Sequence, residues 1–421
     1  MSLNVIFFFF KNSPLPVTLD GIRFVIDCGK HKARDFSGTT GMESLMIQDI
    51  SQAQAAQRTG RAGRVSAGIC FRLYTEDAFA SLEEASVPEI LRVNLAQVVL
   101  MLKGMGVHNP ADFDYLTPPS RDSLKKACEL LYALGALDDN LDLTPYGRRM
   151  AKLPADPIYA HLLLQSGKYG CTDEMLTIVS MLSAENVLFR PGGSGGEDPA
   201  GSGGIAAKAA MAHRRFTSHE GDIPTLLRIY KAWRSEALYL TEGSKKAQKQ
   251  VLKAAQGGMQ QQSGVRMLHG DWCSQNFISG RALVRAHDVR RQLRNLCQRS
   301  VEKNGLGMDI DSSCGEDMEA FLKCVCAGLF LQSASRLPNV KEIKGRGAGS
   351  VVSTRGHYKT KVGNSEVSIH PTSALFARNP APKCVVFTEL LVTKKTYIRG
   401  VTQVREEWLA EVAPKFFSGS K

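Results

Sequence analysis

The sequence lacks the cysteine spacings that mark a metal or redox site. It has ten cysteines among 421 residues, but no two form a C-x-x-C pair, and the closest are Cys324 and Cys326. This spacing argues against a zinc site, a thioredoxin-like motif and a disulfide framework. We therefore expect no bound metal ion and free, buried thiols in a reducing compartment.

Long apolar runs are also missing. A membrane-spanning helix needs about 20 consecutive apolar residues, and no stretch approaches that length. The segment NVIFFFFKN at residues 4–12 is short, and no charged region or small-residue cleavage site of a signal peptide surrounds it. It is interpreted either as a buried strand or as the product of a shortened gene model. We expect no membrane partner.

The phosphate-binding loop G-x-x-x-x-G-K-S/T is a third absence. The segments CGKHK and SGKYG contain a Gly-Lys pair, but both lack the upstream glycine and the hydroxyl residue. An acidic D-E-x-H/D motif that could hold Mg²⁺ is missing too. The chain alone is therefore not expected to bind a nucleotide and its metal ion in the usual way.

Basic residues, in contrast, are abundant. The chain has 53 lysines and arginines against 41 aspartates and glutamates, a net charge of +12. Such a balance favours a polyanionic partner, with nucleic acid ahead of an acidic membrane.

Hydrophobic periodicity indicates several domains, as expected for this length. Short apolar runs at 22–29, 44–51 and 68–75 predict strands that alternate with a helix, as in a doubly wound sheet. From about residue 79 the spacing becomes helical, and the turn at 138–143 between two helices suggests a winged-helix unit. The candidate helix caps are Ser120 or Asp122, and Thr144 followed by Pro145.

The remainder of the chain is predicted to be helical and then β-rich. The final 70–90 residues, roughly, have the short strands and turns of a five-stranded barrel. Two low-complexity inserts, at 191–204 and 243–264, are interpreted as loops rather than active parts. The predicted helices cover 172–189, 223–240, 281–303 and 316–335.

The segment AAQRTGRAGRV, residues 55–65, concentrates three arginines and two glycines. In a helix that begins at Gln57, the side chains of Gln57, Arg61 and Arg64 would share one face while Arg58 points elsewhere. Each glycine would cost that helix about 1 kcal/mol. The pattern indicates either a planar anion that binds close to the backbone or a solvated basic helix.

These blocks, in order, resemble the DEAH-box ATP-dependent RNA helicases from about Thr18 to Phe417. QRTGRAGR is similar to motif VI of that family, and GICFRLYTEDAF follows it in the expected way. The blocks LLYALGALD, LTPYGRRMAKLPADP, VSIHPTSALF and VVFTELLVTKKTYIR resemble the winged helix, the start of the ratchet domain and the OB-fold.

The resemblance implies a multidomain α/β + α + β fold. Its parts are a partial second RecA-like P-loop NTPase lobe, a winged helix, a helical-bundle ratchet domain, and a connecting helix with a C-terminal OB-fold barrel. Their expected ranges are 1–78 (with 1–17 atypical), 79–147, 148–305 and 306–421. The first RecA-like lobe and the usual motif V are missing, so we expect a fragment or shortened gene model that is inactive alone.

The resemblance also assigns nucleotide-binding roles. Arg61 and Arg64 would act as arginine fingers, and Gln57 would orient the attacking water or contact the γ-phosphate. Gly60 would lie beside the nucleotide, which is ATP with Mg²⁺ in the full-length parent. Asp20 would reach the ribose, or would simply cap the turn before Gly21.

RNA contacts are expected mainly from the OB-fold, where cations alternate with aromatic residues that can stack on bases. The alternative is an ordinary soluble barrel with solvated lysines and core tyrosines. Arginines on a ratchet helix would bind RNA phosphate or pair with acids. The RNA-binding candidates are Lys359, Lys361, Lys394, Lys395, Tyr358, Tyr397, Arg290 and Arg294.

The expected function is 3′-to-5′ RNA remodelling coupled to NTP hydrolysis. The alternative is a non-catalytic RNA-binding or protein-docking module derived from such a helicase. Expected partners are RNA, a G-patch-type activator and ribonucleoprotein assembly factors. The expected location is the nucleus or nucleolus, with the cytoplasm as the alternative.

Overall fold

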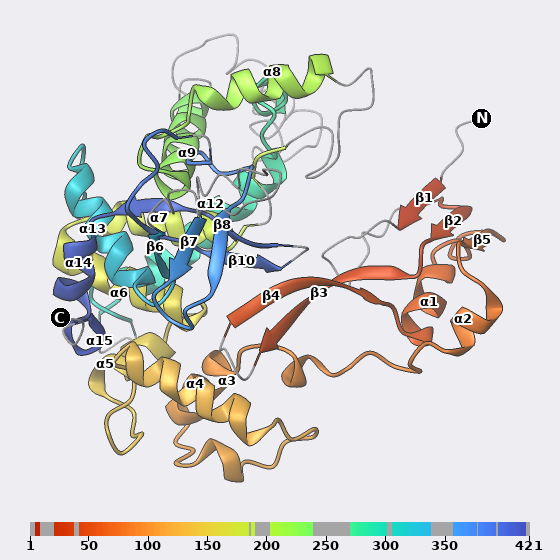
Figure 1. Cartoon of the computed structure of the whole chain (residues 1–421), viewed down its shortest axis with the longest axis horizontal. Coiled ribbons are helices and arrows are strands. Elements are labelled where there is room, and N and C mark those ends of the chain that lie inside the picture. Colours follow the sequence, from red (N-terminus) through yellow and green to blue (C-terminus); the bar gives the residue numbers. More distant parts are fainter. Residues whose placement is uncertain are drawn as a thin grey trace, which may run out of the picture. The chain divides into compact units, whose positions relative to one another are not determined.

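A computed structural model describes most of the chain and divides it into two compact units (Figure 1). The first unit comprises residues 1–133, 139–142 and 389–396, and the second comprises the remaining residues. The structure describes residues 5–8, 21–37, 42–184, 187–189, 203–238, 270–300, 305–337, 357–376, 378–392 and 395–417.

A three-stranded parallel sheet forms the α/β part of the first unit. Its strand order is β1-β2-β5, and the register places Val25 of β2 opposite Ile6 and Cys70. Ile22, Val25 and Ala62 form a small core beside this sheet. The elements are β1 (Val5–Phe8), β2 (Phe24–Asp27), β5 (Ile69–Arg72), α1 (Gln52–Thr59) and α2 (Glu76–Ala80).

The strand predicted at 44–51 exists but does not join that sheet. It is part of β4 (Met42–Asp49), which pairs antiparallel with β3 (Lys30–Ser37) as a two-stranded hairpin. The expectation of one doubly wound sheet is therefore wrong for this strand. Its exposed Met46 and Ile47 fit a strand that is not buried on both faces.

The predicted winged-helix region 79–147 contains the expected helices. Ser120 caps α4, because its hydroxyl accepts a hydrogen bond from the Ser123 amide at 3.1 Å. The wing is a short antiparallel bridge between Leu137 and Leu143. The helices are α3 (Ala96–Gly104), α4 (Arg121–Ala133) and α5 (Pro145–Ala151), with 3-10 turns at Glu89–Leu91 and Pro110–Asp112. The division between the two units falls within this region.

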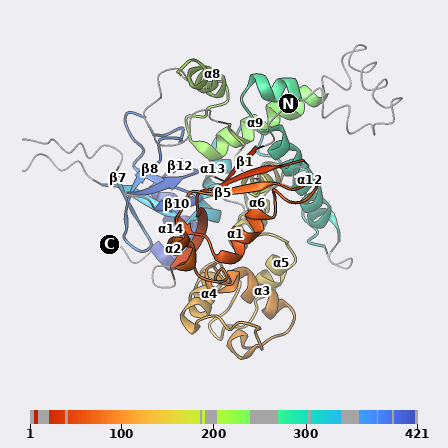
Figure 2. The same cartoon turned by 90° about the vertical axis from the view of Figure 1, so that its right-hand side faces the viewer.

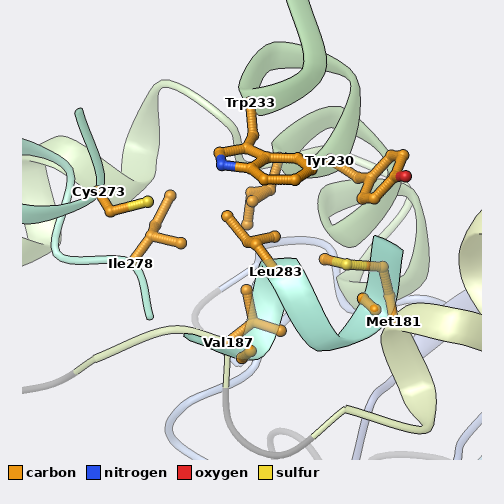
Figure 3. Close-up of a cluster of buried hydrophobic side chains, with 10 residues drawn as sticks. Met181, Val187, Tyr230, Trp233, Cys273, Ile278 and Leu283 are labelled. Carbon is orange, nitrogen blue, oxygen red and sulfur yellow. The ribbon is translucent and has the colours of Figure 1, made fainter. Parts of the chain in front are cut away.

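Packed helices form the core of the second unit. Trp233 and Tyr230 of α9 (Asp222–Leu238) lie over Leu283 of α12 (Gly280–Gln298), and Met181 of α7 (Thr172–Leu182) completes the cluster (Figure 3). Val187 lies in the same cluster. The unit also contains α6 (Pro157–Tyr169) and α8 (Gly203–Arg214), whereas most of the predicted inserts lies outside the described residues.

The helix α13 (Met318–Leu329) crosses α6 at very close range. A Cβ atom on Gly328 would lie 2.4 Å from Cδ1 of Leu162 and 3.0 Å from its Cα. Only glycine fits such an approach without movement of one helix. The expected connecting helix is therefore packed into the helical core.

A mixed sheet follows α13. Within the second unit the strand order is β11-β8-β7-β6-β9-β12, and β8 and β11 are parallel neighbours. The prediction of five strands is thus too low for this part of the described chain. The strands are β6 (Ser333–Arg336), β7 (His357–Thr360), β8 (Glu366–Ile369), β9 (Cys384–Val386), β11 (Thr396–Arg399) and β12 (Thr402–Val404). The strand β10 (Glu389–Val392) lies in the first unit.

Asp222 ties the helices of this unit to its sheet. Its two carboxylate oxygens accept hydrogen bonds from the amides of Ala374 at 2.7 Å and Val401 at 2.8 Å. In Figure 2 the strands β7, β8 and β12 are drawn in the same part of the molecule as α13. The helices α14 (Glu406–Val412) and α15 (Pro414–Phe417) end the described chain. The helical and β-rich parts are therefore joined by more than the covalent chain.

The buried imidazole of His161, on α6, is held in its neutral form by contacts with α5 and α13. Its Nε2 lies 3.2 Å from the carbonyl oxygen of Ala327, and its Nδ1 lies 2.9 Å from the hydroxyl of Tyr146. A neutral ring that donates from Nε2 and accepts at Nδ1 satisfies both partners. Burial lowers the pKa of His161 from 6.5 to about 4.

This shift predicts an acid-sensitive helical core. Between pH 6.5 and 4 the unfolded state binds a proton that the folded state excludes, so stability falls as the pH falls. The loss should approach about 3 kcal/mol. Urea unfolding at pH 7 and pH 4.5 measures it, with His161→Gln as the matched control that should flatten the profile. Identical pH profiles for the two proteins would contradict a neutral buried His161.

Candidate functional site

The helix α1 carries the first part of the arginine-rich segment and begins with a complete capping box. The Ser51 hydroxyl accepts from the Gln54 amide at 3.2 Å, and the Gln54 side chain accepts from the Ser51 amide at 3.1 Å. Two of the amides at the start of the helix are thereby satisfied. The capping box fixes where α1 begins, at Gln52, five residues before Gln57.

The helix ends where the glycines begin. Thr59 is its last residue, Gly60 is its C-cap, and residues 61–66 form turns and bends. The expectation that Gln57, Arg61 and Arg64 share one face of a helix is therefore wrong, because the helix ends before it would have to include Gly60 and Gly63. These residues instead occupy the last turn of α1 and the loop that follows it.

A close backbone contact shapes this loop. A Cβ atom on Gly68 would lie 2.2 Å from the carbonyl oxygen of Ala62 and 2.5 Å from that of Arg23, so a side chain cannot be accommodated there. Ala62 is buried against Val25 and Ile22. The loop is thus fixed at Ala62 and Gly68, and the predicted site residues lie around these two points.

Arg58 differs from the other arginines of the segment because it faces the protein interior. Its guanidinium donates to the fully buried carboxylate of Asp27 at 2.5 Å and to the Lys30 carbonyl at 3.1 Å. The same carboxylate accepts from the Tyr74 hydroxyl at 3.1 Å and the Gly29 amide at 3.0 Å. Arg58 therefore has a structural role as the cation that pairs with the buried Asp27 carboxylate.

The Asp27 network also holds the Tyr74 hydroxyl in its protonated form. Burial, followed by the adjacent Asp27 carboxylate, raises the pKa of Tyr74 to about 12. This network was not predicted from the sequence. The feature that could have predicted it is the aspartate at the end of the apolar segment FVID, because a buried carboxylate requires a charged or hydrogen-bonding partner.

The residues with expected nucleotide roles are placed differently. Gln57 and Arg64 are exposed, and Arg61 is half-buried. Gln57 lies in the last turn of α1, and the two arginines lie in the connection between α1 and β5. A nearby pocket of about 380 Å³ is lined by Thr59, Arg72, Phe79 and neighbouring residues, but by none of these three. Asp20 lies outside the described residues.

The ratchet arginines are engaged within the protein. Arg290 is only 5% exposed, donates to the Thr177 hydroxyl at 2.9 Å and pairs with Asp173. Arg294 pairs with Asp311 at 2.6 Å. The two alternatives for these arginines were binding of RNA phosphate and pairing with acids, and the structure shows pairing with acids. The expectation that Arg290 contacts RNA is wrong, because its guanidinium is buried in this network.

The candidates in the β-rich part also separate by burial. Tyr358 is fully buried and donates to the Pro382 carbonyl at 2.8 Å, so it has no exposed face on which a base could stack. Lys361 pairs with Glu406 at 2.5 Å. Tyr397 is half-buried, with its ring edge-to-face against His370. Lys359 and Lys395 are exposed, while Lys394 lies outside the described residues.

In the described ranges, no group of three His, Cys, Asp or Glu side chains is placed to hold a metal ion. None of the helices found there has the length and apolar character needed to cross a membrane. All ten cysteines are free thiols, and six of them are buried.

Three family models match the chain. They describe the winged-helix part of a helicase associated domain (HA2) at residues 127–155, the ratchet-like part of that domain at 156–226, and an oligonucleotide/oligosaccharide-binding (OB)-fold at 321–416. Together they confirm the expected kinds of domain in this part of the chain.

Curated relatives match 95% of the chain. The mouse ATP-dependent RNA helicase DHX33 is 39% identical over 404 residues, which are 48% of that protein. The human probable ATP-dependent RNA helicase DHX35 is 35% identical over 48% of its length, and the Arabidopsis thaliana pre-mRNA-splicing factor ATP-dependent RNA helicase DEAH10 is 36% identical over 49%. The chain thus spans about half the length of these relatives.

The buried pair between Arg58 and Asp27 predicts a contrast within one motif. Arg58→Met keeps the aliphatic stem but leaves the buried carboxylate without its cation, which should cost about 3 kcal/mol. Arg61→Met, the matched control, should change stability by less than about 0.5 kcal/mol. Hydrogen–deuterium exchange of the β2 and α1 amides measures the local free energy of opening. A loss of stability in Arg58→Met that is no larger than the loss in Arg61→Met would contradict the structural role of Arg58.

Proposed function

We propose that this protein acts as an ATP-dependent RNA helicase, because its chain matches the C-terminal portion of DEAH-box RNA helicases along 95% of its length. The observation that carries the proposal is the ordered set of winged-helix, ratchet-like and OB-fold matches, preceded by a QRTGRAGR loop. The relatives are named for ATP-dependent activity on RNA, and the same activity is proposed here for the full-length parent.

Nucleotide chemistry is assigned to the loop after α1. Arg61 and Arg64 would neutralise charge on the γ-phosphoryl group of ATP, while Gln57 would orient the attacking water and Gly60 would let the phosphates approach the backbone. Mg²⁺, when bound, would supply positive charge that helps to neutralise the phosphates. A first RecA-like lobe outside this sequence would supply the phosphate loop and the metal-binding carboxylates. The Arg58–Asp27 pair supports this division, because it positions the end of α1, from which the loop starts.

RNA is the proposed polymeric substrate, and remodelling in the 3′-to-5′ direction is the proposed outcome. Lys359 on β7, Lys361 and Lys395 after β10 are exposed candidates, and we propose that Lys359 and Lys395 bind RNA because Lys361 pairs with Glu406. Both would contact backbone phosphate. Tyr397 is half-buried and would stack on a base only through the accessible part of its ring.

An activator of the G-patch type is proposed to dock on the winged-helix region. The support is four exposed apolar side chains on α3 and in the segment that follows it, which a partner could cover. Its members are Met101, Met105, Phe113 and Leu116. The test is whether a G-patch peptide stimulates ATP turnover by the two-lobe protein and whether Met105→Glu abolishes that stimulation.

The protein is further proposed to work in the nucleus or nucleolus.

The second candidate function is a non-catalytic RNA-binding or docking module. It is favoured by the absence of a phosphate-binding loop and of an acidic metal-holding motif in this sequence. ATP turnover after addition of a first RecA-like lobe distinguishes the two functions, because a docking module would stay inactive.

ATP turnover provides the decisive test of the loop. The chain alone should show no turnover above background, and a two-lobe protein should hydrolyse ATP in an RNA-dependent way. There, Arg61→Ala should lower kcat by about 10³ or more, since arginine fingers are typically worth 10³–10⁵. ADP affinity should fall much less. Equal turnover in Arg61→Ala and the parent would remove the loop from catalysis.

RNA binding should respond to the exposed lysines and not to the loop. Lys359→Glu with Lys395→Glu should weaken binding to a labelled oligouridine and reduce the salt slope by roughly 0.7 per lost contact. Arg61→Ala, the control, should bind RNA like the parent. Fluorescence anisotropy over a salt series measures both quantities, with circular dichroism to verify folding. A folded double variant with unchanged affinity and slope would exclude these lysines from the RNA path.

A further inference from the structure

Ser66 lies in the arginine-rich loop but has no role in the proposed chemistry. The sequence Arg61-Ala-Gly-Arg64-Val-Ser66 places arginines five and two residues before this serine. Residues 61–68 are neither helix nor strand, and Arg64, Val65 and Ala67 are exposed while Ser66 is half-buried. Between the fixed points Ala62 and Gly68, this irregular and accessible part of the loop can enter the groove of a modifying enzyme by local opening.

A third arginine is already positioned beside the serine. Arg23 donates from Nε to the Ser66 hydroxyl at 3.2 Å. Its backbone carbonyl accepts from the Ile69 amide at 2.8 Å, and Gly68 packs directly against the same carbonyl. The guanidinium has five N–H donors in a planar fork, which matches the oxygens of a phosphate group. Arg23 is thus held next to the serine by the sheet and the loop.

We propose that Ser66 is a phosphorylation site for an arginine-directed serine/threonine kinase, and that Arg23 binds the resulting phosphate. The Ser66 hydroxyl oxygen would attack the γ-phosphorus of ATP in the active site of that kinase. The new O–P bond replaces the bond to the β-phosphate oxygen, ADP leaves, and the serine proton passes to the base of the kinase. Arg61 and Arg64 provide the upstream cations that an acidic kinase groove recognises.

The modification would act directly on the loop. Phosphoserine has a charge of about −1.5 to −2 near pH 7 and three strong acceptor oxygens. Two residues from Arg64, it would compete with nucleotide phosphate for the guanidinium groups of the loop. This regulatory consequence rests on the proposed nucleotide role of Arg61 and Arg64, whereas the modification and its Arg23 contact do not.

The first test identifies the modified residue. The full chain is incubated with MgATP and a panel of purified arginine-directed serine/threonine kinases, and phosphopeptides are quantified by mass spectrometry. Ser66 should be modified to roughly half or more by at least one kinase, and Arg64→Gln should reduce this by about tenfold. Ser300, which is exposed but follows only the single Arg299, is the matched control serine. Modification of Ser66 no greater than that of Ser300 with every kinase would overturn the proposal.

The second test locates the phosphate. In the full chain with phosphoserine installed at position 66, ³¹P NMR gives its second pKa, which is about 6 without a partner. We expect Arg23→Gln to raise this pKa by roughly half a unit or more, because it removes the nearest cation. Arg72→Gln, which removes an arginine of β5 that stacks on Phe79, is the matched control and should leave it unchanged. An equal pKa in the parent and Arg23→Gln would overturn the Arg23 assignment. Neither readout depends on ATP turnover, so failure of the helicase proposal would remain distinguishable.

Discussion

The carboxylate of Asp27 is the interaction on which the first unit depends. It ends β2 in a fully buried position and accepts hydrogen bonds from Arg58 on α1, Tyr74 after β5 and the Gly29 amide. A charge buried this deeply is tolerated only with a cation and further donors around it. Because its partners come from α1 and from the segment after β5, their positions relative to β2 are fixed. The loop between α1 and β5 therefore starts and ends at defined points.

Charge in this basic protein is divided between internal pairing and an accessible surface. Arg58, Arg290 and Lys361 are each matched to a carboxylate within their own unit. These pairs stabilise helices and strands, so they contribute to folding rather than to recognition of RNA. Lys359 is exposed, and the pair between Lys361 and Glu406 also lies at the surface. The net charge alone thus indicates a polyanionic partner, whereas the burial of Arg58 and Arg290 identifies cations that cannot meet it.

Local signals were reliable in the sequence, whereas long-range pairing was not. Thr144 caps α5 and Ser120 caps α4, as their short-range hydrogen-bonding patterns predict. The segment at 44–51 forms a strand, but its β-hairpin partner could not be told from its own alternation. The burial of Tyr358 and the pairing of Arg290 with Thr177 depend on contacts with residues far away along the chain. No local pattern distinguishes such residues from exposed ones of the same type.

The central claim is that the loop after α1 stabilises the transferring phosphoryl group rather than simply binding nucleotide. A transition-state analogue tests it most directly, because arginine fingers act on charge that develops during transfer. In a two-lobe protein, the affinities for ADP and for ADP with aluminium fluoride can be compared between the parent and Arg61→Ala. The variant should bind ADP nearly as the parent does and bind the analogue about 100-fold or more weakly. Equal affinity of both proteins for the analogue would contradict the claim.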